Sequence, residues 1–129
     1  MKKLLLFIGV VLVVISAAQA ADYQCNVETK LTREHVYSRS ELQKGQISVL
    51  IEERDGSTFL SRCSFASSSQ AVTCDRYEVD KVVLDEFVRI KKFYVFRSQF
   101  DVQVYPDLSF IENNGRGGIA FGTCSITAP

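Results

Sequence analysis

The single histidine of the sequence, His35, is the first side chain to consider for acid–base or nucleophilic chemistry. A Ser-His-Asp or Cys-His arrangement would have to be built around this ring, with Glu34 and Ser38 or Ser40 as its neighbours. These neighbours are common residue types, and no nucleophile-elbow motif accompanies them. We therefore interpret His35 as a solvated loop residue and predict no nucleophilic catalysis.

Pairs of carboxylates are the second possible source of catalysis. Glycosidase chemistry needs two carboxylates about 5–9.5 Å apart across a cleft. The acidic clusters at residues 52–55 and 85–86 fall at predicted turns and are typical of charged surface. Asp75, Asp80 and Asp101 fall within predicted strands, where a charge must face water, a partner or a pocket. A small hydrolase that uses these strand carboxylates is therefore one alternative function.

Four cysteines follow the first 20 residues, and an even number in a small exported chain predicts two disulfides. Composition alone leaves three pairings open, but strand register distinguishes them. If the strands on either side of residues 67–70 form a hairpin, Cys63 lies directly opposite Cys74, within reach of a disulfide. The second predicted disulfide, between Cys25 and Cys124, then joins the first strand to the last.

Metal binding is the rival use of these cysteines. The sequence contains no C-x-x-C pair, and His35 is the only histidine that could act as a further ligand. We therefore predict no metal site and no cofactor.

A basic aromatic run covers residues 89–97, Arg-Ile-Lys-Lys-Phe-Tyr-Val-Phe-Arg. Cations beside aromatic rings are the chemistry by which proteins bind single-stranded nucleic acids. The charge balance argues against such a partner, because loss of Lys2 and Lys3 leaves 15 − 2 = 13 basic residues against 15 acidic ones, a net charge of −2. We interpret the run as an amphipathic strand and expect no nucleic-acid partner, while an anionic glycan stays open as a ligand.

A glycine-rich segment near the C-terminus is the preferred candidate for a binding loop. It contains Asn113, Asn114, Gly115, Arg116, Gly117 and Gly118. Asn and Gly are the residue types that a tight hairpin turn requires where φ is positive. Arginine is enriched at the energetic centres of protein interfaces, so a protruding turn that presents Arg116 could enter the cleft of a partner. The competing interpretation is a turn whose glycines have only a structural role.

The first 20 residues have the three parts of a secretory signal peptide. Lys2 and Lys3 form a positive start, residues 4–15 are almost entirely apolar, and residues 18–20, Ala-Gln-Ala, fit a cleavage site. The apolar run is too short to span a bilayer, which needs about 20 residues. We therefore predict a secreted or periplasmic protein without a membrane anchor after cleavage. Its remaining part, residues 21–129, is expected to form a single β domain.

The elements that must position these residues are predicted to be short strands. Residues 23–31 alternate between apolar and polar types, which indicates a half-buried strand. Alternation over residues 47–51 predicts a second strand. A three-residue turn at 54–56 would place Ile51 opposite Phe59, whereas a two-residue Asp-Gly turn would shift the pairing by one residue. We favour the three-residue turn.

Further strands are predicted over residues 58–66, 71–79, 91–96, 100–105, 108–112 and 119–125. Residues 77–84 can continue as a strand, but helical spacing also fits 79–91, and we prefer strand because β-branched and aromatic residues dominate. The polar segment 32–45 is either an irregular loop or a short helix closed by Gly45. We favour the loop.

Together these elements predict an all-β fold, a single small antiparallel barrel or sandwich of seven to eight strands with two disulfides. The aromatic residues between Phe87 and Tyr105 are expected to build much of its core, because each can bury on the order of 150–250 Å². Exposed loops on such a rigid scaffold are common sites of function.

We therefore expect an exported, non-catalytic binding module that contacts another protein through the tip 113–118 and the polar loop 32–45. One form of this role is a hydrolase inhibitor whose Arg116 loop enters the cleft. Small exported bacterial lysozyme inhibitors share the signal peptide, the disulfide and the compact β-barrel. The Ser-Gly motif that they place in the lysozyme cleft is not convincingly present here, since Asp55-Gly56-Ser57 is a poor substitute. The chain is therefore assigned to no family.

A carrier for a small apolar ligand is the second alternative function. In that case an aromatic-lined barrel would enclose the ligand, with Phe93, Phe96 and Phe100 around the cavity. A filled core would count against this hypothesis. The oligomeric state is left open.

Overall fold

The structure, a computed structural model, describes residues 21–127 and the isolated Gly9, so the rest of the predicted signal peptide lies outside the described residues. Its strands are β1 (Asp22–Leu31), β2 (Ser48–Arg54), β3 (Ser57–Ala66), β4 (Ala71–Glu78), β5 (Lys81–Leu84), β6 (Lys91–Val95), β7 (Phe100–Val104), β8 (Ser109–Asn113) and β9 (Ile119–Thr127). The short helix α1 (Arg39–Gly45) and the 3₁₀ turn η1 (Phe96–Ser98) complete the described elements.

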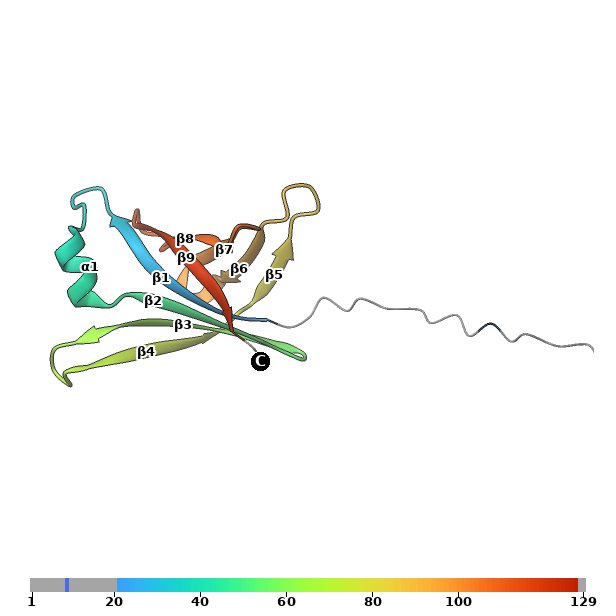
Figure 1. The fold of residues 1–129 in the computed structure, drawn as a ribbon, viewed down its shortest axis with the longest axis horizontal. Coiled ribbons are helices and arrows are strands. Elements are labelled where there is room, and N and C mark those ends of the chain that lie inside the picture. The colour runs from blue at the N-terminus through green and yellow to red at the C-terminus, as the bar shows by residue number, and fades with distance from the viewer. Residues whose placement is uncertain (1–8, 10–20, 128–129) are drawn as a thin grey trace, which may run out of the picture.

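All nine strands belong to one antiparallel sheet in the order β4-β3-β2-β1-β9-β8-β7-β6-β5. The sheet curls into a half-barrel with β4 and β5 as its edges (Figure 1). The predicted all-β antiparallel fold with two disulfides is confirmed, with nine strands in place of seven to eight.

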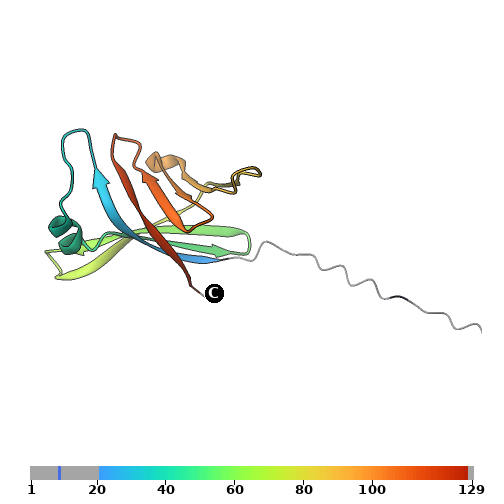
Figure 2. The same ribbon diagram turned by 45° about the horizontal axis from the view of Figure 1, so that its top comes forward.

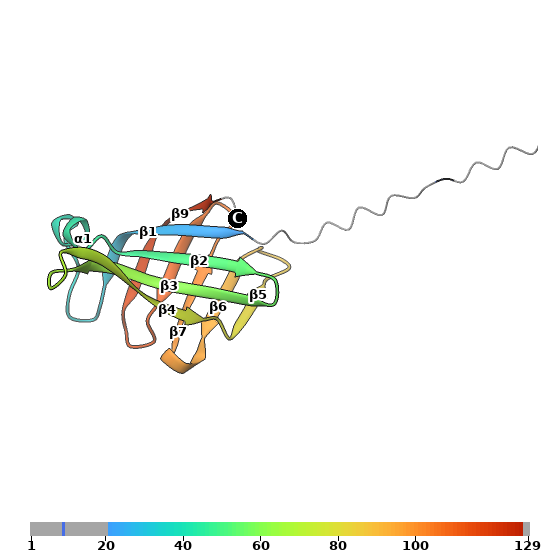
Figure 3. The same cartoon turned by 90° about the horizontal axis from the view of Figure 1, so that it is seen from below.

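The curl of the sheet brings its two halves face to face. Seen from below, β1–β4 run across the front while β6 and β7 pass behind them at a steep angle (Figure 3). Side chains of the concave face fill the space between the halves. The helix α1 lies at one end of the molecule, outside this core (Figure 2).

The hydrophobic core lies on the concave face because alternate residues of each strand point inward. Its largest fully buried side chains are Cys25, Val49, Ile51, Leu60, Phe93, Val102 and Phe110. The expectation that the aromatic residues after Phe87 build the core is confirmed for Phe93 and Phe100. It is wrong for Phe87 and Phe96, which are 94% and 58% exposed because they lie in turns rather than in strands.

Both predicted disulfides are present, Cys25–Cys124 and Cys63–Cys74. Each joins directly opposed residues of neighbouring strands, the first between β1 and β9 and the second between β3 and β4. The predicted register of the β3–β4 hairpin is therefore confirmed. Two disulfides are consistent with an oxidising environment outside the cytosol. In the part of the chain that the structure describes, no helix has the length and apolar character to cross a membrane.

The turn between β2 and β3 differs from the prediction. It has two residues, Asp55 and Gly56, so Glu52 rather than Ile51 pairs with Phe59. Ile51 instead pairs with Leu60, and both side chains are completely buried. Apolar residues occupy both faces of β3, and the turn chemistry decides the register, since Gly56 adopts φ = 78° as a tight Asp-Gly turn requires.

The segment 79–91 is neither a helix nor one continuous strand. β4 ends at Glu78, and β5 occupies only Lys81–Leu84. The Asp80 carboxylate accepts a hydrogen bond from the Phe96 N–H at 2.7 Å, which fixes the bend between the two strands. The turn that we expected at Asp85-Glu86 follows β5, and the Asp85 carboxylate caps the N–H groups of the two residues after Glu86.

The segment 32–45 combines both of the alternatives considered for it. An irregular loop comes first, but the preference for a loop throughout is wrong because α1 begins at Arg39. A capping box starts the helix: the Ser38 hydroxyl accepts from the Glu41 N–H, and the Glu41 carboxylate accepts from the Ser38 N–H, both at 3.1 Å. The helix ends at Gly45, the residue named in the helical alternative.

Candidate functional site

The hairpin tip between β8 and β9 is a tightly hydrogen-bonded loop. The Asn114 side-chain oxygen accepts from the N–H groups of Arg116 and Gly118 at 2.8 and 2.9 Å. The Asn113 side-chain oxygen accepts from the Gly115 N–H at 2.9 Å. The two asparagines therefore hold the backbone on either side of Arg116, whose own side chain is exposed.

Two glycines of the tip are required by close packing. A Cβ atom at Gly115 would lie 1.8 Å from the backbone oxygen of Gln99, and a Cβ atom at Gly118 would lie 2.2 Å from the Asn114 amide. Gly115 also adopts φ = 72°, which favours glycine. The structural role that we considered for these glycines is thus real, because neither position has room for a side chain.

The hairpin tip and the loop after β1 lie side by side because Leu31 pairs with Ile119 at this end of the sheet. Together they line an open recess of about 570 Å³. Its lining residues, which we call the loop surface, are Thr32, Arg33, Glu34, Gly115, Arg116 and Gly117. Two loops far apart in the sequence therefore present two exposed arginines, Arg33 and Arg116, around one recess.

A charged pair inside the half-barrel is a feature that the sequence analysis missed. Arg62 Nη2 lies 2.7 Å from Glu112 Oε1, and Glu112 is only 8% exposed. The Arg62 guanidinium also lies over the Phe100 ring, 4.7 Å from its centroid. Glu112 alternates in phase with the buried Phe110, but the predicted three-residue turn between β2 and β3 had placed Phe59 rather than Leu60 on the inner face and so directed Arg62 outward.

The strand carboxylates considered for a hydrolytic pair have different surroundings. Asp75 lines a small hollow of about 180 Å³ beside Glu112. Asp80 is bonded to the backbone at the bend after β4, and Asp101 receives a 3.3 Å hydrogen bond from the Gln103 amide on β7. The Arg62 guanidinium pairs with the Glu112 carboxylate in the hollow near Asp75, so this geometry gives the hydrolase hypothesis no support.

The aromatic side chains proposed to line a carrier cavity also separate. Phe93 and Phe100 are 0% and 3% exposed and pack into the hydrophobic core. Phe96 is largely exposed, and its ring stacks on Tyr94 at a centroid distance of 5.8 Å. These three rings therefore do not surround one cavity, which counts against this form of the carrier.

The basic aromatic run divides between several environments. Lys91 points into the half-barrel and forms an ion pair with Glu53. Arg89 lies in the turn before β6 with φ = 60°, and Arg97 lies in η1. The cations do not form one continuous stripe along the strand.

His35 contacts the helix cap rather than a nucleophile. Its Nε2 atom lies 2.8 Å from Glu41 Oε2, and both side chains are exposed. The contact with His35, followed by the Ser38 N–H hydrogen bond, holds the pKa of the Glu41 carboxyl below its usual value. Among residues 21–127, no group of three or more His, Cys, Asp or Glu side chains is arranged to hold a metal ion.

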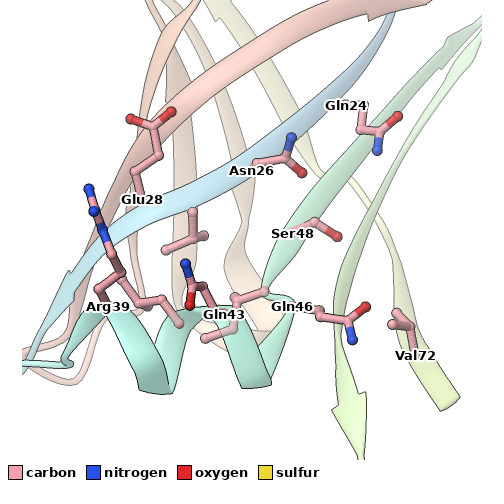
Figure 4. A pocket seen from close by; sticks show the side chains of 11 residues that line it. Gln24, Asn26, Glu28, Arg39, Gln43, Gln46, Ser48 and Val72 are labelled. Atoms are coloured by element: carbon pink, nitrogen blue, oxygen red, sulfur yellow. The ribbon is translucent and has the colours of Figure 1, made fainter.

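An open groove of about 640 Å³ lies between α1 and β1 (Figure 4). We call it the amide groove because side-chain amides line both of its walls. Its polar lining residues are Gln24, Asn26, Glu28, Arg39, Gln43, Gln46 and Ser48. Arg39 and Gln43 belong to the polar loop 32–45 that we had selected as a binding surface, whereas the other polar lining residues carried no signal, since exposed amides are ordinary surface residues until the two elements are seen to face each other.

Comparison with known proteins adds no relative. No family model, curated protein or solved structure matches this chain. The loop surface and the amide groove are therefore the features from which its function is inferred.

Proposed function

We propose that this protein is an exported, non-catalytic binding module that holds another protein through the loop surface. One observation carries the proposal: the hairpin tip and the loop after β1 line a single recess and place Arg33 and Arg116 around it. The two loops selected from composition are thus neighbours in space. The predicted signal peptide and the two disulfides support a role outside the cytosol.

The rigidity of the tip supports binding without a large entropic cost. Hydrogen bonds from three backbone N–H groups to Asn113 and Asn114 hold the loop in one shape before a partner arrives. Binding then has to order only the exposed side chain of Arg116 and its neighbours. Arginines in such positions are common energetic centres of interfaces.

The chemistry of the loop surface points to an acidic partner. A guanidinium group binds carboxylates with two parallel hydrogen bonds, and the loop surface offers two such groups against the single carboxylate of Glu34. The cleft of a glycoside hydrolase contains two catalytic carboxylates and is a concave surface of this charge. We therefore propose inhibition of an extracellular hydrolase with an acidic cleft as the specific form of this function.

A binding and inhibition assay tests the proposal. The purified mature protein is titrated against a panel of secreted lysozymes and other acidic-cleft glycosidases, with affinity and residual hydrolysis measured together. At least one enzyme should be bound and inhibited. Arg116→Ala should weaken that binding about tenfold or more, as expected for a central interface arginine, and Arg33→Ala should weaken it in the same direction.

Arg97→Ala is the matched control, because Arg97 is an exposed arginine in η1 that does not line the loop surface. It should leave affinity and inhibition unchanged. Equal weakening by all three substitutions, or binding that none of them alters, would contradict a role for the loop surface. If the protein bound none of the enzymes in the panel, the proposal that it inhibits a hydrolase would be contradicted.

A further inference from the structure

We propose that the amide groove binds an extended peptide segment, at a site separate from the loop surface. The groove is bounded by β1 on one wall and by α1 and the residue after it on the other, with Ser48 of β2 and Val72 of β4 also in its lining (Figure 4). This second site goes beyond the proposed function, since the two surfaces share no lining residue.

The spacing of the polar side chains along both walls fits an extended chain. On the β1 wall, Gln24 and Asn26 are two residues apart, which corresponds to about 6.6 Å along a strand. On the helix wall, Arg39 and Gln43 are four residues apart, which corresponds to about 6 Å along the helix axis. In Figure 4 these two rows lie on opposite sides of the groove.

An extended peptide repeats its hydrogen-bonding groups at the same interval. Every second residue directs both its N–H and its C=O to the same side, so each side of the peptide repeats about every 6.6 Å. A Gln or Asn amide offers a donor and an acceptor together and can pair with both groups of one residue. Amides on two facing walls can therefore hold the two sides of one peptide backbone.

The groups that would make these bonds are free to do so. Within residues 21–127, the side-chain amides of Gln24, Asn26, Gln43 and Gln46 make no hydrogen bond to the protein. The helix buries none of its own residues, so it does not close the groove by packing onto the sheet. Leu42 and Ile47 add apolar surface at the helix side of the groove.

The lining favours a peptide over a glycan. The groove residues include no aromatic ring on which a sugar could stack. They do include several amides, which can pair with a peptide backbone. Charged side chains are confined to Glu28 and Arg39, which lie at one end of the groove in Figure 4. The rest of the lining carries no charge and combines amides with apolar side chains such as Leu42, Ile47 and Val72, so it suits an uncharged peptide backbone together with apolar side chains of the peptide.

The test uses a pool of random-sequence hexapeptides with acetylated and amidated ends, so that only backbone and side chains are offered. ¹⁵N-labelled protein is titrated with the pool and, separately, with a neutral chitin tetrasaccharide, while the side-chain amide signals of the protein are followed by NMR. We expect the peptides to shift the amide signals of Gln24, Asn26 and Gln43. Peptides selected from the pool should bind about tenfold more weakly to the variant Gln24→Ala/Asn26→Ala, because two amide pairs are lost.

Gln103→Ala is the matched control, because Gln103 is also a strand glutamine but lies on β7, away from the groove. It should bind the selected peptides as the wild type does, and unchanged backbone spectra of all variants verify the fold. Absence of any peptide-induced shift, saturation by the chitin tetrasaccharide instead of peptides, or equal peptide affinity in the double variant would overturn the proposal.

Discussion

At the scale of single residues, the ion pair between Arg62 and Glu112 on the concave face contributes to stability through charge compensation. A charge that is largely removed from water is costly unless a partner compensates it. The Arg62 side chain keeps 30% of its surface exposed and the Glu112 side chain 10%, so the penalty for an unpaired charge is reduced but not removed. The pair links β3 to β8 across the concave face, beside a small hollow that Asp75 also lines.

Removal of one partner should therefore destabilise the fold. We expect Glu112→Ala to lower the free energy of unfolding by about 2 kcal/mol, because Arg62 is then left without its counterion. The double variant Arg62→Met/Glu112→Leu should recover most of this loss, since it removes both charges and keeps the volume. Urea denaturation of the three proteins measures the differences. Destabilisation of the double variant beyond that of Glu112→Ala would contradict the explanation.

At the scale of elements, α1 depends on its cap more than on packing. The helix has seven residues and buries none of them, so its order rests on the Ser38–Glu41 capping box and the contact between Glu41 and His35. A helix of this length is marginal by itself in water. Because α1 forms one wall of the amide groove, the cap also maintains the shape of that groove.

Acid should consequently loosen α1 before it unfolds the sheet. The pKa of the Glu41 carboxyl is lowered in the folded protein, so its ionised form adds stability above the ordinary glutamate pKa. That stability is lost as the pH falls through the lowered folded value. The amide proton signal of Ser38, which donates to Glu41, should titrate with a midpoint below that of an ordinary glutamate.

His35→Ala should move this midpoint upward, because the His35 contact is the largest cause of the lowered pKa. Glu34→Gln is the control, since Glu34 is an exposed glutamate outside the capping box. A Ser38 signal that titrates at the ordinary glutamate value in the wild type would exclude the cap as a pH-dependent contact.

The elements also show what the sequence could predict. Alternation located the strands, and the hairpin around residues 67–70 gave both disulfides correctly, because a four-residue polar loop leaves one plausible register. The predicted register between β2 and β3 was wrong because both Phe59 and Leu60 are apolar, and only the turn geometry decides which of them pairs with Ile51. The predicted Cys25–Cys124 disulfide already made the first and last strands neighbours, but the meeting of the two loops was not foreseen, since it depends on the register that pairs Leu31 with Ile119.

At the scale of the whole molecule, the two disulfides constrain the chain to different extents. Cys25–Cys124 spans 99 residues and joins the central strands, whereas Cys63–Cys74 spans 11 residues within one hairpin. In the loop-entropy description, a longer closed loop gives greater stabilisation. The first disulfide therefore constrains nearly the whole described chain, and the second only its own hairpin.

Replacing each pair with alanines should separate these contributions. We expect Cys25→Ala/Cys124→Ala to lose about 4.7 kcal/mol and Cys63→Ala/Cys74→Ala about 2.8 kcal/mol, a difference of about 2 kcal/mol. Guanidinium denaturation under oxidising conditions measures both. The reverse order, with the hairpin disulfide contributing more, would show that strand packing rather than chain entropy governs the outcome.

The pairing of β1 with β9 has one practical consequence. Asp22 pairs with Thr127 at one end of these two strands, while Leu31 pairs with Ile119 beside the loop surface at the other. A tether fused before residue 22 or after residue 127, to a bead, an affinity tag or a cell envelope, would thus leave from the pole opposite to both arginines. An immobilised form of this protein would therefore present the loop surface outward whichever terminus anchors it.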